Sequence, residues 1–193
     1  MKPFSFLVVL SSILLMISCN QDKKTSSPET KDNKDSTQVV PTESKNENID
    51  DRSESLAKMA PLSADEMKEL LPMELMGAQR NNEDVNSAIG TNIATAEYRI
   101  NDSTTLELAV IDCAGPAGAG VYGSQYVSML NLSEEDDKEY TRTIDFNGEK
   151  AFENCSKTNV QCNLTWFSGR FLVSLSGNLP ASKLKEIAAA LKF

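Results

Sequence analysis

Apolar and polar positions divide this chain into three parts. The first is a 14-residue apolar run from Phe4 to Ile17, interrupted only by serines. The second, from Asn20 to about Ser55, consists mostly of Lys, Asp, Glu, Ser, Thr and Asn. The third alternates apolar and polar residues with the periods of helices and strands. The pattern predicts an apolar leader, a polar linker and one folded domain.

Three stretches of the third part have helical spacing. Ser63 and Glu66 predict a capping box that starts a helix, which Pro72 limits or kinks. A second helix is predicted from Pro116 to about Asn131. A third is predicted from about Pro180. Its buried face repeats at helical spacing: Leu184, Ile187, Ala188 and Leu191.

Strands are predicted between these helices. Residues 94–100 and 106–110 alternate in polarity on either side of a turn at residues 101–103. Further along, Asn147-Gly148 is a strong hairpin signal. It predicts three cross-strand pairs: Ile144 with Ala151, Asp145 with Lys150, and Arg142 with Glu153. A second turn at Ser168-Gly169 predicts four more: Trp166 with Phe171, Leu164 with Val173, Cys162 with Leu175, and Asn163 with Ser174.

The predicted order is α-β-β-α-β-β-β-β-α. Short connections between strands favour an α+β fold, with a mostly antiparallel sheet of about six strands and three helices packed on its dry face. In layout this order loosely resembles the PsbP/Mog1-like α/β sandwich, which also occurs in bacterial lipoproteins. The resemblance carries no site residues over.

The apolar leader ends at Ser18-Cys19 and follows a positive residue, Lys2. It is shorter than the ~20 residues that span a bilayer, and its length suits a signal peptide. A small residue before a cysteine at this place resembles the lipobox of bacterial lipoproteins, although Met16 stands where the family prefers Leu. The resemblance implies that signal peptidase II cuts before Cys19 and that Cys19 then carries acyl chains such as palmitate. These chains anchor the protein to a membrane. An ordinary secretory signal and an uncleaved anchor are the alternatives.

The resulting domain prediction has three segments. Residues 1–18 are the signal peptide, residues 19–56 are the lipidated cysteine with a disordered polar tether, and residues 57–193 are one globular domain. As a flexible coil, a tether of ~36 residues has ends roughly 30–36 Å apart. Asn20, in place of the Asp that retains many enteric lipoproteins, favours the outer membrane over the inner one. The triplets at 35–37 and 102–104 (Asp-Ser-Thr) resemble a short O-glycosylation motif of Bacteroidetes.

Composition narrows the possible functions. The formal net charge is −9, and cleavage before Cys19 would remove one Lys and no acid, which gives −10. An acidic chain repels nucleic-acid backbones, so no nucleic-acid partner is expected. The chain has no histidine. This excludes Ser-His-Asp and Cys-His catalysis and removes the commonest zinc ligand.

Three cysteines remain after Cys19. An exported protein meets an oxidising compartment, so a disulfide between Cys155 and Cys162 is predicted. Pairing of Cys113 with one of these two, three free thiols, or a three-cysteine metal site are the alternatives. We propose no metal and no cofactor from the sequence.

Residues 118–123 fit the pattern G-x-G-x-x-G. A dinucleotide fold needs a parallel βαβ unit, whereas hairpins are predicted on both sides of this motif. Close packing of a helix on the sheet therefore explains the glycines better than nucleotide binding does. Trp166 and Tyr98 can line a ligand groove, but their cross-strand spacing favours the core.

The leading hypothesis is a lipid-anchored envelope protein whose domain binds or interacts structurally without catalysis. Its partners are the membrane, through the lipid, and another envelope protein, a glycan or an apolar ligand. One alternative is a carrier of lipid or another hydrophobic ligand. The other is a histidine-free enzyme with a site near Asp112 and Cys113. A filled core would favour the interaction module. A deep apolar pocket would favour the carrier, and acids converging in a cleft would favour the enzyme.

Overall fold

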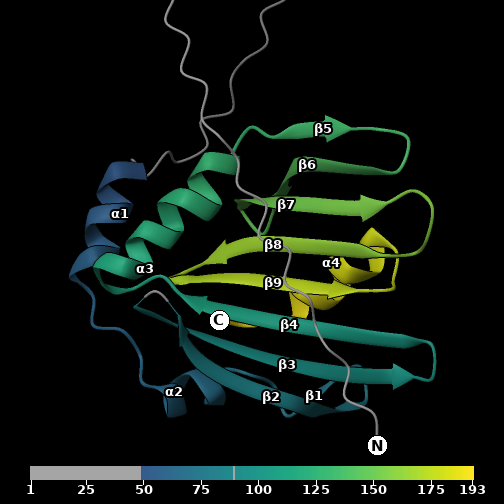
Figure 1. The fold of residues 1–193 in the computed structure, drawn as a ribbon, viewed down its shortest axis with the longest axis horizontal. Helices are drawn as coiled ribbons and strands as arrows, with labels where there is room; N and C mark the ends of the chain where they lie inside the picture. The colour runs from purple at the N-terminus through teal and green to yellow at the C-terminus, as the bar shows by residue number, and fades with distance from the viewer. Residues whose placement is uncertain (1–48, 89) are drawn as a thin grey trace, which may run out of the picture. The chain divides into compact units, whose positions relative to one another are not determined.

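A computed structural model describes residues 49–88 and 90–193 of the chain (Figure 1). Within them the fold is α+β, with a single antiparallel sheet of nine strands in the order β1-β2-β3-β4-β9-β8-β7-β6-β5. The strands are β1 (Glu74–Leu75), β2 (Ala78–Ala88), β3 (Thr91–Asn101), β4 (Thr104–Asp112), β5 (Ser133–Glu135), β6 (Glu139–Phe146), β7 (Glu149–Ser156), β8 (Cys162–Ser168) and β9 (Phe171–Gly177). The α-helices are α1 (Ile49–Lys58), α2 (Ala64–Glu69), α3 (Gly115–Val121) and α4 (Ala181–Ala190).

The prediction of about six strands and three helices was therefore wrong. Strand β2 was missed because its sequence is polar almost throughout and offers no apolar alternation. It pairs along β3 with an irregularity between Asn81 and Asp84. Strand β5 was missed because it is an acidic, fully exposed edge strand. Charges on an edge strand oppose pairing with other chains.

Helix α1 begins inside the segment predicted to be a disordered tether. Only Leu56 of this helix is fully buried, so its sequence lacks the apolar face that marks a packed helix. Residues 1–48, which include the predicted signal peptide, Cys19 and the rest of the tether, lie outside the described residues.

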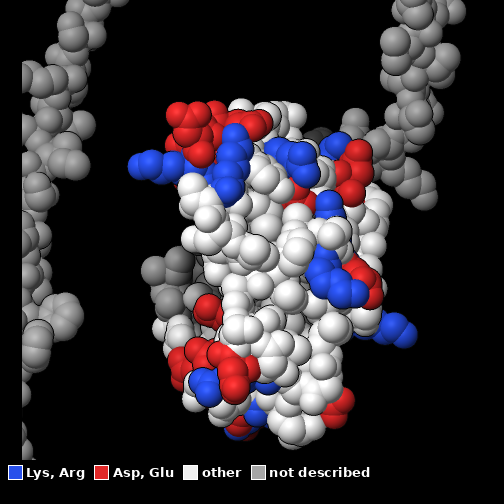
Figure 2. Space-filling model, turned by 90° about the vertical axis from the view of Figure 1, so that its right-hand side faces the viewer, with Lys and Arg blue, Asp and Glu red and all other residues white. Residues whose placement is uncertain are grey.

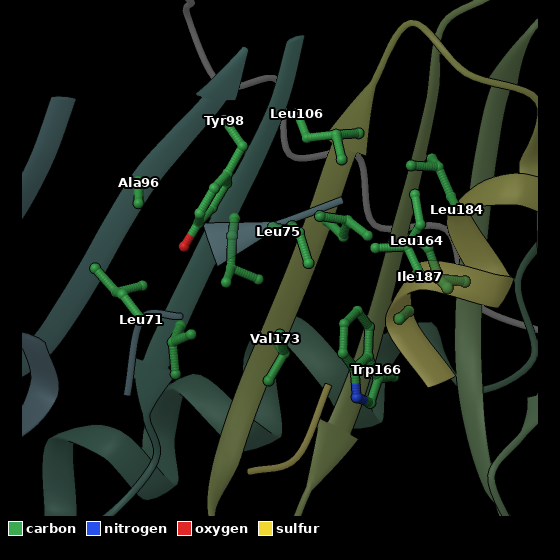
Figure 3. Close-up of a cluster of buried hydrophobic side chains, with 14 of the residues drawn as sticks. Leu71, Leu75, Ala96, Tyr98, Leu106, Leu164, Trp166, Val173, Leu184 and Ile187 are labelled. Carbon is green, nitrogen blue, oxygen red and sulfur yellow. The ribbon is translucent and has the colours of Figure 1, made fainter. Parts of the chain in front are cut away.

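Both faces of the sheet carry helices, so the prediction that helices pack on one face was wrong as well. Helices α2 and α4 cover one face (Figure 1). Between them and the sheet lies a core cluster that includes Leu71, Trp166, Val173, Leu184 and Ile187 (Figure 3). Helices α1 and α3 lie on the other face. They cover an aromatic cluster made of Leu56, Cys113, Ala119, Val121, Tyr122, Tyr126, Phe152, Phe167 and Leu172.

The hairpin at Asn147-Gly148 has the predicted register. Ile144 pairs with Ala151, Asp145 with Lys150, and Arg142 with Glu153. Both turn residues have positive φ, 52° and 84°, which is the requirement of a type I′ turn. Local turn chemistry therefore determines this pairing.

The register predicted for β8 and β9 was wrong by two residues. Ser168 pairs with Phe171, and Trp166 pairs with Val173. The loop is therefore Gly169-Arg170, with φ of +60° at Gly169. A positive φ at the first loop position is typical of a type II′ turn, in which glycine comes first rather than second. A shift of two residues keeps every side chain on its face, so the predicted dry face still holds.

The predicted helix starts agree better with the structure than the predicted ends do. Ser63 and Glu66 form the capping box that begins α2. The helix ends at Glu69 with Leu70 as its C-cap, and Glu74–Leu75 after Pro72 form β1 instead of continuing it. Helix α4 begins after Pro180 and buries Leu184, Ile187 and Ala188, as predicted, whereas Leu191 is its C-cap and is only partly buried. Helix α3 continues through a π-helical turn η1 (Tyr122–Tyr126) and a 3-10 turn η2 (Val127–Met129).

Gly118 explains part of the glycine-rich motif. A Cβ at this position would lie 2.4 Å from the backbone carbon of Cys113 and 2.7 Å from the carbonyl oxygens of Asp112 and Cys113. Glycine therefore lets the first turn of α3 pack directly on the end of β4. At Gly120, a Cβ would meet nothing within 4 Å. The motif is a packing feature at its first glycine.

We predict that Gly118→Ala destabilises the protein by about 1–3 kcal/mol, because the added methyl group overpacks a rigid backbone contact. Gly120→Ala in the same helix should be neutral or stabilise by up to about 1 kcal/mol, since alanine favours a helix over glycine. Urea unfolding followed by circular dichroism measures both. Equal effects of the two substitutions would contradict the close approach.

Candidate functional site

Asp112 is a fully buried acid at the end of β4, beside the start of α3. Its carboxylate faces the guanidinium of Arg170, which lies in the β8–β9 loop. Arg170 donates from Nε to Oδ1 at 2.8 Å and from Nη2 to Oδ2 at 2.7 Å. Two parallel bonds between an arginine and a carboxylate are a strong and directional pairing.

Backbone groups make further hydrogen bonds with both side chains. The amide of Leu62 donates to Oδ2 at 2.7 Å, and the amide of Ala114 donates to Oδ1 at 3.1 Å. Arg170 Nη2 also donates to the carbonyl of Ala60 at 2.8 Å. We call these five residues the Asp112 junction. It joins the segment before α2, the β4–α3 connection and the β8–β9 loop at one point.

Cys113 lies next to Asp112 and its side chain is fully buried. Burial raises the pKa of this thiol to about 12. The nucleophilic form of cysteine is the thiolate, and at neutral pH this thiol stays protonated. The pair that the sequence selected as a possible catalytic site therefore consists of a carboxylate engaged by four donors and a buried neutral thiol.

Cys155 and Cys162 form the predicted disulfide, with Cα atoms 4.1 Å apart on paired strands β7 and β8. Cys113 is a free cysteine. A three-cysteine metal site is excluded because two of the three sulfurs are bonded to each other. Among residues 49–88 and 90–193, no group of three acids or cysteines is placed to hold a metal ion.

Glu153 is a second buried acid, and it was not among the sites predicted from the sequence. It lies on β7, on the same face as Ala151 and Cys155, and is 1% exposed. Its Oε1 accepts from Tyr140 at 2.9 Å and from Arg142 Nε at 3.0 Å. The signal was present, since Glu153 interrupts a run of apolar positions on the dry face of a predicted strand.

Lys185 of α4 completes the surroundings of Glu153. Its Nζ lies 2.9 Å from Oε2 as an ion pair, although no aligned hydrogen-bond donor reaches this oxygen. Burial acts to raise the pKa of Glu153, but Lys185, Tyr140 and Arg142 together lower it below the ordinary value of 4.5. Glu153 therefore connects α4 to strands β6 and β7 through charge.

Trp166 and Tyr98 both belong to the core cluster. The Trp166 ring lies 5.6 Å from the ring of Phe146 and 6.4 Å from that of Phe193. The hydroxyl of Tyr98 donates to the carbonyl of Pro72 at 2.7 Å. Side chains thus fill the space between the sheet and α4, where a ligand groove was the alternative.

Part of the sheet face that carries the aromatic cluster is polar. Asn154 is two residues from Phe152 on β7 and so shares its face. It donates to Thr141 at 2.6 Å, and Asn163 donates to Ser174 at 2.7 Å across β8 and β9. These half-buried side chains satisfy one another, as on the solvated face of an antiparallel sheet.

Charged side chains gather where β5 meets β6. Figure 2 shows acidic and basic side chains together at the top of the face that it draws. The acids are Glu134, Glu135, Asp136 and Asp137, all exposed. Lys157 partly neutralises them through an ion pair with Glu135 at 2.6 Å. A shallow hollow next to this region is lined mainly by acidic and hydroxyl side chains.

Another hollow, of about 290 Å³, adjoins α1. It is lined by Arg52, Ser55, Leu56, Met59, Glu149 and Gly169.

Within the part of the chain that the structure describes, no helix is long and apolar enough to cross a membrane.

Comparisons with known proteins do not assign this chain to a family. No protein-family description, no curated protein and no solved structure matches it. The roles of the candidate sites are therefore inferred from their geometry in this structure.

We predict that Asp112→Asn destabilises the protein by roughly 3–5 kcal/mol, because it leaves Arg170 without its counter-charge in a mostly buried place. Asp145→Asn is the matched control. Asp145 also pairs with a cation, Lys150, but its side chain is 85% exposed. Its loss should cost less than about 1 kcal/mol. Denaturant unfolding distinguishes the two, and a similar small loss in both would show that the Asp112 junction is not structural.

The lowered pKa of Glu153 predicts a specific pH dependence. A depressed folded-state pKa gives stability that is present above the ordinary value of 4.5 and is lost as pH falls through the folded value. The free energy of unfolding of the wild type should therefore approach that of Glu153→Gln on acidification from pH 6 to below 4. Urea unfolding of both proteins at several pH values measures this difference, and other acids contribute equally to both. A difference that does not change with pH would contradict the ion-pair role of Glu153.

Proposed function

We propose that this chain is a bacterial envelope lipoprotein whose domain acts by non-covalent interaction and without catalysis. The observation that carries the second part is the Asp112 junction. Its carboxylate accepts from Arg170 and from two backbone amides, and its neighbour Cys113 is buried and protonated. The groups in this chain best suited to chemistry thus serve to hold segments together.

The anchor is inferred from the sequence. Lys2, the short apolar run from Phe4 to Ile17 and the pair Ser18-Cys19 have the order of a lipoprotein signal. Acyl chains on Cys19 would attach the mature chain to a membrane. Asn20 favours the outer membrane over the inner one.

The carrier and enzyme alternatives have less support. A carrier needs apolar space, whereas Trp166, Phe146 and Phe193 pack together between the sheet and α4. An enzyme near Asp112 and Cys113 needs a group free to react, whereas both are engaged or buried there. An interaction module needs only a stable domain with an exposed surface. We therefore propose that another envelope protein is the partner.

Metabolic labelling with radioactive palmitate tests the anchor. We expect label on the wild-type chain and none on Cys19→Ala, because the thiol that would carry the lipid is gone. Cys113→Ala is the matched control and should keep the label, since Cys113 is an internal cysteine of the folded domain. Equal labelling of wild type and Cys19→Ala would contradict the lipid anchor.

Crosslinking on intact cells tests the interaction. The wild-type chain is compared with a tether-only chain that ends at residue 48. We expect at least one envelope protein to be enriched on the wild type, and its enrichment should be lost when the domain is unfolded by Asp112→Asn combined with Gly118→Ala. If both chains capture the same proteins to the same extent, the proposed role of the domain is wrong.

A further inference from the structure

The two edges of the sheet differ in how they are protected against pairing with another chain (Figure 1). Strand β5 forms one edge, has three residues and carries two acids, Glu134 and Glu135. Short length and charge are common means of protecting an edge strand. At the other edge, β1 covers β2 only at Ala78 and Gln79. Among the described residues, no strand lies beside the rest of β2 on that side.

The regular part of this open edge runs from Asp84 to Ala88. The pairing of β2 with β3 is irregular between Asn81 and Asp84, and from Asp84 onward the residues of the two strands pair one to one. Of these five residues only Asp84 is charged, and none is a lysine or a proline. The stretch is about as long as an average strand, and it lacks most of the features that discourage pairing.

The backbone groups of Val85 and Ser87 point away from β3. A connection of two residues joins Ala88 to Thr91, and a hairpin of this kind closes on a hydrogen-bonded pair. Hydrogen-bonded and non-hydrogen-bonded pairs alternate along an antiparallel ladder, so Asn86 bonds to β3 whereas Val85 and Ser87 do not. The amides and carbonyls of Val85 and Ser87 therefore face the open side of the sheet.

The first part of β2 shows the same alternation. The amide of Arg80 points to the open side, where it donates to the carbonyl of Met73 at 2.8 Å, next to β1. Here a segment of the chain itself satisfies the outward groups of β2. The stretch from Asp84 to Ala88 offers equivalent groups to a strand from outside.

This stretch is complementary to a second copy of itself. When two copies run antiparallel about a two-fold axis at Asn86, Val85 of each copy faces Ser87 of the other. Both residues present an outward amide and carbonyl, so the two pairs exchange four hydrogen bonds. Asp84 then faces Ala88 of the second copy, so no like charges meet directly. Directly opposite residues share a face, so each face of the sheet continues into the same face of the second copy.

The rest of the domain leaves this edge accessible. Asn86 and Ser87 are exposed. Helix α2 meets β2 before the stretch, where Lys68 forms an ion pair with Glu83. A two-fold axis at Asn86 therefore puts the two copies of α2 at opposite ends of the junction. The same operation on β5 would place Glu134 opposite Glu134 of the second copy, which favours β2 as the edge that pairs.

We propose that the open edge of β2 is a dimer interface. Residues Asp84–Ala88 pair antiparallel with the same residues of a second copy and join two nine-stranded sheets into one. Main-chain hydrogen bonds supply the affinity, as in other cases of strand addition. Five residues on each side bury little surface, so the dimer is weak in solution. This inference goes beyond the proposed function, because it assigns a second copy of the chain to a defined surface.

Cysteine crosslinking tests the pairing. Residue 86 faces residue 86 of the second copy as a non-hydrogen-bonded pair, with Cα atoms about 4.5 Å apart, which permits a disulfide. The full chain carrying Asn86→Cys is purified in excess detergent, so that few micelles hold two chains, and is oxidised with copper phenanthroline. Asn159→Cys, at an exposed position between β7 and β8, measures random collision. We expect at least about tenfold more covalent dimer from Asn86→Cys, because pairing raises the effective concentration of the two thiols.

Two substitutions at Ser87 separate backbone pairing from side-chain contact. Ser87→Pro removes an outward amide hydrogen and leaves the bonds between β2 and β3 in place. Added to Asn86→Cys, it should reduce the covalent dimer to the level of Asn159→Cys, whereas Ser87→Ala should leave crosslinking unchanged. Circular dichroism checks that each variant is folded. Equal crosslinking at positions 86 and 159, or crosslinking that a folded Ser87→Pro variant retains, would overturn the dimer.

Charge substitution at Asn86 tests the two-fold axis without proline or cysteine. Asn86→Asp and Asn86→Lys each bring like charges together at the axis, so each variant alone should dimerise less than the wild type. An equal mixture of the two should dimerise at least as well as the wild type, since opposite charges then face each other. Sedimentation equilibrium in density-matched detergent measures this, and Asn159→Asp, with the same change in net charge as Asn86→Asp, should behave like the wild type. A mixture that dimerises no better than either variant alone would overturn the pairing, and so would a wild type that stays monomeric up to about 1 mM.

Discussion

The pairing of Asp112 with Arg170 is the constraint on which the arrangement of this domain depends. A carboxylate removed from water needs a counter-charge and hydrogen bonds on both oxygens, and here Arg170 and two backbone amides supply them. The donors come from three places far apart in the chain. Satisfying one buried charge therefore fixes where α2 begins, how β4 leads into α3 and how the β8–β9 loop closes. Gly118 acts at the same place, because it lets α3 pack on the backbone of Cys113.

The two faces of the sheet differ as a consequence. On one face α2 and α4 enclose a continuous core cluster, and Glu153 ties α4 to the sheet through Lys185. On the other face α1 packs along α3, and Leu56 and Arg52 of α1 contact the aromatic cluster.

Features set by neighbouring residues were predictable. The Asn147-Gly148 hairpin, the capping box of Ser63 and Glu66, and the face of α4 follow from local geometry, and so does the disulfide between neighbouring strands. The register of β8 and β9 was missed because glycine takes the first position of its turn. Strands β2 and β5 and helix α1 were missed for another reason. Their residues are polar, and only their neighbours in space make them strands or a helix.

The sequence by itself determined the positions of the strongest turns and helix starts and the absence of histidine chemistry, and it predicts the leader and the lipid signal. Only the tertiary structure decided what Asp112, Cys113 and Glu153 do. Each of these side chains takes its role from partners dozens of residues away or on another element, such as Arg170 for Asp112 and Lys185 for Glu153. Burial and charge pairing are properties of the packed chain, and a one-dimensional pattern does not contain the distances that set them. For that reason a pair of residues that looked reactive in the sequence is, in the fold, a point of attachment.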